Sequence, residues 1–369
     1  MPALALFAVA VWLLVRAAEP GTAEVVAVAF LAAYGLTPFI RRGALRGGAV
    51  DVPDSRKRHG APTPRMGGVA VVGALVLALG RQPLHDPQVL SVALCAMFLM
   101  FLGALDDTRG VSSGLRLSVQ VLCALAVIAA GVRLHLLPGP GGAAIDVVLS
   151  ILWIVGITNA YNFIDGLDGL AACLGALIAL LLAIVAGSNG QGDVQMICLA
   201  MTGALLGFLP HNLRPNRPAT IFLGDSGSAS VGFLLASLAI VQDWAENDPL
   251  VALAAPILIF SVLIYDMIQT TVSRIATGRV RSFRQWIDYV GRDHIHHRFQ
   301  ALLGGPRRAL LLILVLALGL GLSALGLRRG SSGEAILFLV HGALVLLVVA
   351  VLEGAASRAR RRRAREREP

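Results

Sequence analysis

The chain has 369 residues, of which 56% are hydrophobic and 14% are charged, and its mean hydropathy is +0.76. Because a soluble domain carries roughly 25% charged residues, this composition excludes a soluble globular protein and indicates an integral membrane protein. Much of the net charge of +9 comes from the basic segment 356–369, which lacks interleaved aromatic residues. That segment favours contact with anionic lipid head groups over binding of nucleic acid.

The first apolar run, 2–15, is followed by Arg16 and permits two interpretations. It is short for a transmembrane span, and it lacks the basic region and cleavage site of a signal peptide. We therefore expect residues 1–20 to form an extra N-terminal span, ahead of a single multi-span domain over 21–355 and a basic cytoplasmic tail over 356–369.

Apolar stretches then follow one another along the chain. A helix needs about 20 residues to cross a hydrocarbon core of about 30 Å. The chain is therefore predicted to be an all-α polytopic bundle of about 11 transmembrane helices, or 12 with the N-terminal run. The stretches are 23–40, 66–80, 88–105, 115–132, 145–159, 169–187, 194–210, 227–242, 250–271, 309–327 and 335–353.

Loop charges predict the orientation of these spans, because Lys and Arg accumulate on the cytoplasmic side. If residue 21 lies outside and the spans alternate, the inside segments contain 26 of the 31 Lys and Arg residues. The same assignment places every strongly polar motif at the cytoplasmic face. The four cysteines all fall inside apolar runs without CxxC pairing and are predicted to be small core residues: Cys95, Cys123, Cys173 and Cys198.

The first polar motif, 51–68, surrounds two prolines with basic residues, among them Arg58 and Arg65. Basic residues beside a span ordinarily determine topology. The prolines and the pair Gly67-Gly68 favour a shaped loop packed near a site. Both interpretations remain open.

The second motif is Asp106-Asp107, at the end of an apolar run. Successive helical residues point about 100° apart, so the two carboxylates cannot face one ligand equally. One can contact a reacting phosphate while the other is held by basic neighbours or a metal; a solvated acidic helix end is the alternative.

The third motif, NAYNFIDGLDGLA, spaces four polar residues by three: Asn159, Asn162, Asp165 and Asp168. That spacing places them near one face if the segment is helical. The glycines at 166 and 169 suggest instead a turn at which the backbone approaches a ligand closely.

The fourth motif is the sequence GDSGS at 224–228, which opens an apolar run. Small residues and free N–H groups at a helix start can hold a phosphate, and Asp225 supplies an oxygen ligand suited to Mg²⁺. An ordinary helix cap is the simpler alternative.

The last motif, RDHIHHRF, brings together His294, His296 and His297 between two arginines. Zinc binding would need a further ligand at suitable spacing, so contact with a phosphate or sugar is favoured, with a structural cluster as the other alternative. The surrounding loop, 272–308, has the mixed spacing of an amphipathic interfacial helix. Asp266, late in its span, is costly beside lipid and should face inward to support these His or Arg residues.

Taken in order, the five motifs resemble those of the polyprenyl-phosphate N-acetylhexosamine-1-phosphate transferases, over residues 23–353. The sequences RKRHGAPTPRMGG and HIHH are more similar to the branch that uses UDP-N-acetylglucosamine or a related UDP-sugar. The muramoyl-pentapeptide branch typically carries three adjacent histidines.

The resemblance implies transfer of a sugar-1-phosphate from a UDP-N-acetylhexosamine to undecaprenyl phosphate, with release of UMP and a requirement for Mg²⁺, or Mn²⁺ in its place. It also implies a bacterial inner-membrane protein with a cytoplasmic active site, and it allows a homodimer. The implied catalytic residues are Asp106, Asp107 and Asp168, with Asp106 deprotonating or orienting the lipid phosphate, and the implied metal ligands are Asp225 and Asp106. The implied substrate contacts are Asn162, Asp165, Phe222 (stacked on uracil), Arg58, Arg116, His294, His296 and His297.

The chain departs from the family pattern in three places. The family usually has a Lys after the Asp pair, and here Arg109 or Arg116 would take its role. Asn212 and Asn216 are rival candidates for one polar role before the fourth motif. The acidic residue that the family often has just before the histidines is shifted to Asp293. The alternatives are a phospho-N-acetylmuramoyl-pentapeptide transferase and a membrane transporter. A transporter predicts carboxylates at mid-span depth, whereas here nearly all lie at span ends.

Overall fold

The computed structural model describes residues 21–51, 62–80, 84–242, 244, 248–289, 291–327 and 330–365. The apolar run 2–15 and Arg58 lie outside these residues, so the extra N-terminal span and the role of Arg58 stay predictions. The chain divides into two compact units, and the boundary between them follows Trp244.

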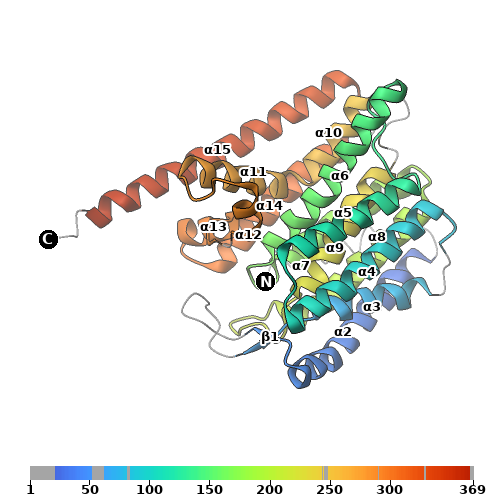
Figure 1. Cartoon of the computed structure of the whole chain (residues 1–369), viewed down its shortest axis with the longest axis horizontal. Coiled ribbons are helices and arrows are strands. Elements are labelled where there is room, and N and C mark those ends of the chain that lie inside the picture. Colours follow the sequence, from blue (N-terminus) through green and yellow to red (C-terminus); the bar gives the residue numbers. More distant parts are fainter. Residues whose placement is uncertain are drawn as a thin grey trace. The chain divides into compact units, whose positions relative to one another are not determined.

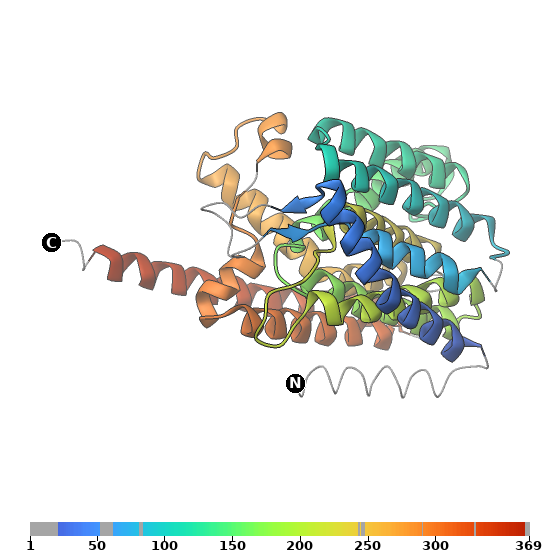
Figure 2. The ribbon, with the colours of Figure 1, turned by 90° about the horizontal axis from the view of Figure 1, so that it is seen from below.

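The first unit consists of helices and one two-stranded ladder (Figure 1). Its elements are α2 (Thr22–Gly47), β1 (Val50–Asp51), β2 (Thr63–Pro64), α3 (Gly67–Leu79), α4 (Pro87–Arg109), α5 (Ser113–Ala129), α6 (Gly139–Ile164), α7 (Leu170–Ser188), α8 (Gly192–Asn212) and α9 (Gly224–Val241). The antiparallel ladder pairs Val50 with Pro64 and Asp51 with Thr63, directly after α2 (Figure 2).

The core of this unit is formed by α7, α8 and α9, most of whose side chains are buried. Small residues let neighbouring helices approach closely. A Cβ atom at Gly203 or Gly207 of α8 would overlap the backbone carbonyls of Val26 and Phe30 in α2. The pairing of α8 with α2 therefore depends on these two glycines.

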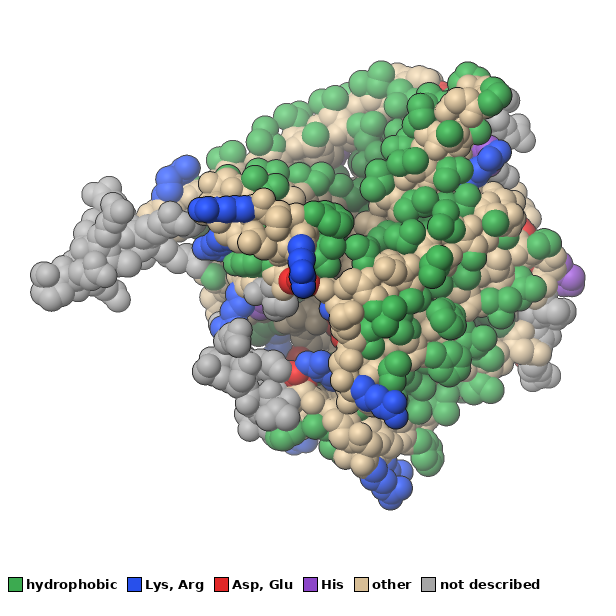
Figure 3. Space-filling view, viewed as in Figure 1, with side chains coloured by type: hydrophobic (Ala, Val, Ile, Leu, Met, Phe, Trp, Pro, Cys, Tyr) green, Lys and Arg blue, Asp and Glu red, His purple; other side chains and the backbone are tan. Residues whose placement is uncertain are grey.

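The outer helices of the first unit expose a continuous apolar surface. Along α4, Leu90, Leu94, Phe98 and Phe101 recur at helical spacing and are between 44% and 61% exposed. Figure 3 shows hydrophobic side chains over this face of the unit. Because water would not stabilise such a surface, it is suited to contact with lipid acyl chains.

The second unit contains α10 (Pro249–Ile259), α11 (Ser261–Ala276), α12 (Phe283–Asp288), α13 (Ile295–Leu303), α14 (Pro306–Gly326) and α15 (Ser332–Arg365). The helices α10 and α11 meet at Phe260 with a bend of 76°, four residues after Pro256. The expected interfacial segment forms two short helices, α12 and α13. Helix α15 continues beyond residue 355, so the basic tail begins as an extension of the last helix.

The prediction of a polytopic helical membrane protein is confirmed in its coarser form. Among the described residues, eight helices are long and apolar enough to cross a membrane, and the bent pair of α10 and α11 would make nine. Two of the expected stretches form the shorter helices α3 and α5, with 13 and 17 residues. The count of eleven spans thus stays a prediction.

Candidate active site

The start of α9 packs against α3 and α4 through glycines. A Cβ atom at Gly68 of α3 would overlap the backbone of Gly227, and one at Gly103 of α4 would overlap the backbone of Asp225. The N–H groups of Gly67 and Gly68 donate to the carbonyls of Phe222 and Leu223, at 2.9 and 2.8 Å. The first and fourth sequence motifs therefore form one backbone framework that fixes Asp225.

Asp107 caps the first turn of α9 from the neighbouring helix α4. Its Oδ1 accepts from the N–H of Asp225 at 3.0 Å, and its Oδ2 accepts from that of Ser226 at 3.1 Å. The residue that precedes α9, Leu223, offers no side-chain cap. Since the first N–H groups of a helix need partners, Asp107 supplies what the local sequence lacks.

Asp106 turns to different partners, as helical geometry predicts for adjacent residues. Its carboxylate accepts from Nη1 of Arg116 at 2.9 Å and from the N–H of Val111 at 2.6 Å. The same Nη1 atom lies 3.7 Å from Oδ1 of Asp225. Arg116 thus bridges two of the predicted carboxylates, and its side chain is 39% exposed.

Asn162 joins the third motif to the fourth. Its Nδ2 donates to Oδ1 of Asp225 at 2.8 Å and to Oγ of Ser228 at 2.6 Å. Asn162 and Asp225 are among the residues predicted from the sequence, whereas Ser228 is not. Ser228 lies one helical turn after Gly224, and this spacing is the signal that could have identified it. In the structure its Oγ also donates to the carbonyl of Gly224.

Asp165 follows the end of α6 and lies near the same carboxylates. Burial raises its pKa well above the usual range, and repulsion from Asp225 and Asp107 adds to this effect. A backbone hydrogen bond from Gly224 and the charge of Arg65 offset only part of it. Asp165 is therefore a buried carboxyl group beside two further carboxyl groups.

The other two members of the third motif also contact other segments of the first unit. Nδ2 of Asn159 donates to Gln120 at 2.6 Å, and Asp168 accepts from the N–H of Ala219 at 3.0 Å. Because α6 ends at Ile164, the helical spacing by three does not continue to Asp165 and Asp168. The structure thus places Asp168 against the loop before α9, and its catalytic role stays a prediction.

Asn212 is a positioning residue whose role sequence reasoning left unresolved. It is buried, its Oδ1 accepts from the N–H of Gly169 at 2.8 Å, and its Nδ2 donates to the carbonyl of Ile221 at 3.0 Å. Asn216, by contrast, is exposed and has a positive φ of 56°. Of these two candidates, Asn212 is the one that ties the third motif to the fourth.

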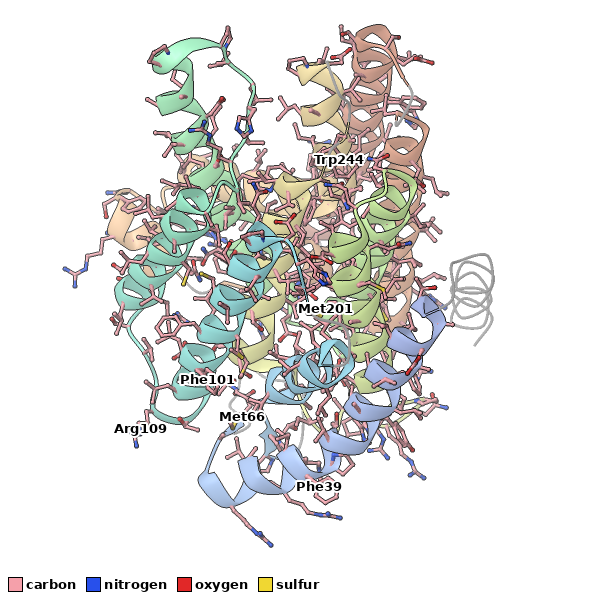
Figure 4. The ribbon with its side chains drawn as sticks, turned by 90° about the vertical axis from the view of Figure 1, so that its right-hand side faces the viewer. Phe39, Met66, Phe101, Arg109, Met201 and Trp244 are labelled. Atoms are coloured by element: carbon pink, nitrogen blue, oxygen red, sulfur yellow. The ribbon has the colours of Figure 1, made fainter. Side chains whose placement is uncertain are left out.

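Phe222 precedes the fourth motif and lies beside the first. It is partly buried, and its N–H donates to the carbonyl of Pro64 at 2.8 Å. Figure 4 shows Met66 and Arg109 at one end of the unit and Trp244 at the other. The polar motifs that flank Met66 and Arg109 share that end.

The carboxylates alone supply only some of the ligands that a Mg²⁺ ion needs. No group of three or more His, Cys, Asp or Glu side chains within the described ranges is arranged to hold a metal ion. Mg²⁺, however, usually takes one or two carboxylates and completes its shell with water and substrate phosphates. The contacts made to Asp225 by described side chains go to Oδ1, which leaves Oδ2 for such an ion.

The histidines belong to the second unit, where Asp266 supports them as expected. Nδ1 of His294 lies 2.8 Å from Oδ2 of Asp266, whose Oδ1 accepts from the N–H of Ile295 at 2.5 Å. Arg274 donates two hydrogen bonds, of 2.7 and 2.9 Å, to the carboxylate of Asp293. Burial acts to raise the pKa of Asp293, but Arg274 outweighs it and leaves that pKa below its usual value.

The three histidines are not equivalent. His296 is 1% exposed, and neither ring nitrogen has a hydrogen-bond partner among the described residues. Burial, reinforced by His297, lowers its pKa to about 3. His296 is therefore a buried, neutral side chain in this structure, with its ring centroid 4.1 Å from that of His297, and its contact with substrate stays a prediction.

The fold and site together define a polytopic helical membrane protein with carboxylates, amides and an arginine gathered at the ends of membrane helices. Residues 89–243 match the model of the glycosyl transferase family 4. With the relatives described next, this match shows that the chain belongs to that family, and the family resemblance is confirmed.

The chain is 30% identical over 336 residues to a Bacillus subtilis protein named "Probable undecaprenyl-phosphate N-acetylglucosaminyl 1-phosphate transferase", covering 89% of this chain and 90% of the relative. It is 33% identical to the decaprenyl-phosphate N-acetylglucosaminephosphotransferase of Mycolicibacterium smegmatis, covering 86% and 85%. It is 27% identical to the undecaprenyl-phosphate alpha-N-acetylglucosaminyl 1-phosphate transferase of Escherichia coli, covering 74% and 75%. The similarity therefore extends over both units.

Proposed function

We propose that the protein transfers N-acetylglucosamine-1-phosphate from its UDP-sugar to undecaprenyl phosphate and releases UMP. The observation that carries this proposal is the cluster of Asp106, Asp225, Asn162 and Arg116 on the framework at the start of α9. The names of the relatives support the same reaction.

The cluster suits phosphoryl transfer because that reaction depends mainly on positioning and on neutralising charge. Arg116 can bind a phosphate oxygen while Asp106 fixes its guanidinium group. Asn162 holds Asp225 in one orientation, and Asp107 holds the turn that carries it. Each of these contacts would limit movement of the reacting groups.

We further propose that Asp225, with Asp106, binds Mg²⁺. The carboxyl groups of Asp107, Asp165 and Asp225 lie close enough to repel one another, and this supports a cation at this place. When bound, the ion would supply charge neutralisation for the pyrophosphate of the UDP-sugar. In the same proposal Asp165 and Phe222 line the nucleotide part of the site, and His294 and His297 contact the sugar or pyrophosphate.

The proposed topology has eleven spans, with α3 and α5 as short ones and the bent pair of α10 and α11 as one. The site would face the cytoplasm at the inner membrane, which the bias of Lys and Arg supports. UDP-sugars are cytoplasmic substrates, and a lipid acceptor requires a site open at the bilayer surface.

The test is release of UMP by the purified full-length protein in detergent, with undecaprenyl phosphate and Mg²⁺. UDP-N-acetylglucosamine should give UMP and a lipid-linked sugar pyrophosphate. UDP-N-acetylmuramoyl-pentapeptide is the comparison substrate, and release of UMP from it alone would replace the proposal with the muramoyl-pentapeptide transferase. Release from neither would reject both.

A further inference from the structure

Helix α15 carries a carboxylate on its buried face. Leu347, Val348, Val351 and Leu352 are each 57% or 58% exposed, whereas Glu353, one helical turn after the buried Val349, is 8% exposed. An acidic side chain in an apolar helix is costly unless it is paired, and it often marks a functional position. Its partners therefore indicate its role.

Glu353 binds three side chains of the second unit. Its Oε1 accepts from Nε of Arg298 at 3.0 Å, and its Oε2 accepts from Tyr265 at 3.0 Å and from Gln269 at 3.4 Å. Two of these partners lie on α11, and Arg298 lies on α13, directly after the histidines. Both carboxylate oxygens are thus occupied.

Arg298 connects this carboxylate to the support of His294. Its Nη1 donates to the carbonyl of Asp293 and lies 3.4 Å from Oδ1 of Asp266. Asp266 in turn contacts Nδ1 of His294 with its other oxygen. A continuous set of polar contacts runs from Glu353 through Arg298 and Asp266 to His294.

We propose that Glu353 is a positioning residue for the histidine motif, an inference that rests on the proposed function. By holding Nε of Arg298, it keeps the guanidinium group from turning fully toward Asp266. Asp266 then remains available to orient His294. A residue that only anchors α15 would affect stability and leave turnover per folded molecule unchanged.

The experiment compares Glu353→Gln with Glu334→Gln, the same change at the exposed start of the same helix. For Glu353→Gln we expect kcat to fall about tenfold and KM for both substrates to change by less than about twofold. Glu334→Gln should behave as wild type. Hydrogen exchange should accelerate in residues 293–300 for the first variant only.

A double variant separates positioning from anchoring. Because Glu353 acts through Arg298, adding Glu353→Gln to Arg298→Gln should lower kcat no further. The proposal is overturned if kcat per folded molecule in Glu353→Gln equals that of wild type, or if the two changes multiply. An inactive wild-type protein would instead reject the proposed function, and hydrogen exchange would still test the contact.

Discussion

The aspartate cluster of the first unit and the histidine cluster of the second satisfy their charges in opposite ways. In the second unit, Asp293 pairs with Arg274, and Glu353 pairs with Arg298. In the first unit, Asp107 is satisfied by backbone N–H groups, and Asp106 and Asp225 share Arg116. The comparison teaches that the second cluster pairs each of these carboxylates with its own arginine, whereas two carboxylates of the first cluster share one arginine, which favours the cation that we propose there.

The largest expected effect comes from removing the carboxylate that we assign to the metal. Asp225→Ala should lower turnover by about a thousandfold or more, since charge stabilisation at the phosphates is lost. UMP release should also lose its dependence on Mg²⁺, measured over a titration of the ion. Asp288→Ala, on the short exposed helix α12, is the matched control. Wild-type turnover in Asp225→Ala would refute the metal assignment and remove the contrast between the clusters.

The second prediction separates the two adjacent aspartates. In Asp107→Asn, an amide N–H₂ group would face one of two backbone N–H donors, leaving a buried group unpaired at a cost of about 1–3 kcal/mol. Both the melting temperature and turnover should fall. Asp106→Asn keeps an acceptor for Val111, so turnover should fall more than either stability or UDP-sugar affinity. Equal loss of stability in both variants would contradict this division of roles.

The third prediction concerns the acid stability of the second cluster. His296 has a folded pKa of about 3, below its ordinary value, so its contribution to stability is present above about pH 6.5 and is lost as pH falls toward 3. Between pH 7 and pH 5 that loss amounts to about 2 kcal/mol. His296→Phe should flatten the fall in unfolding free energy over this window, measured with denaturant in detergent. The control is His85→Asn, at an exposed histidine, which should leave the slope unchanged. An unchanged slope in His296→Phe would contradict the prediction, because it would mean that the His296 ring of the wild-type protein is already protonated in the folded state.

Much of the fold could be predicted from hydropathy alone. Within the described residues, each of the eleven expected apolar stretches coincides with a helix, and 250–271 coincides with the bent pair of α10 and α11. The bend itself was not predicted, because Pro256 lies inside an apolar run whose periodicity continues beyond it. Periodicity reports which residues share an element and carries little information on where its axis turns.

The site shows the same limit at the level of single residues. The sequence motifs identified Asp106, Asp107 and Asp225 as neighbours, but the order of residues could not tell which oxygen meets which N–H group. Asp168 belongs to the motif yet contacts Ala219, and His296 belongs to its motif yet is buried without a partner within the described part of the chain. Glu353 lies in no motif, so only its contacts reveal it.

By itself, the sequence determined that this is a helical membrane protein of a particular transferase family, because apolar length and motif order are properties of the chain. The tertiary structure decided which residues cap, pair or pack. Asp107 became the cap of α9 because α4 brings it beside two unpaired N–H groups, a contact between residues more than a hundred positions apart. Such contacts depend on helix packing through Gly68 and Gly103, which no local pattern encodes.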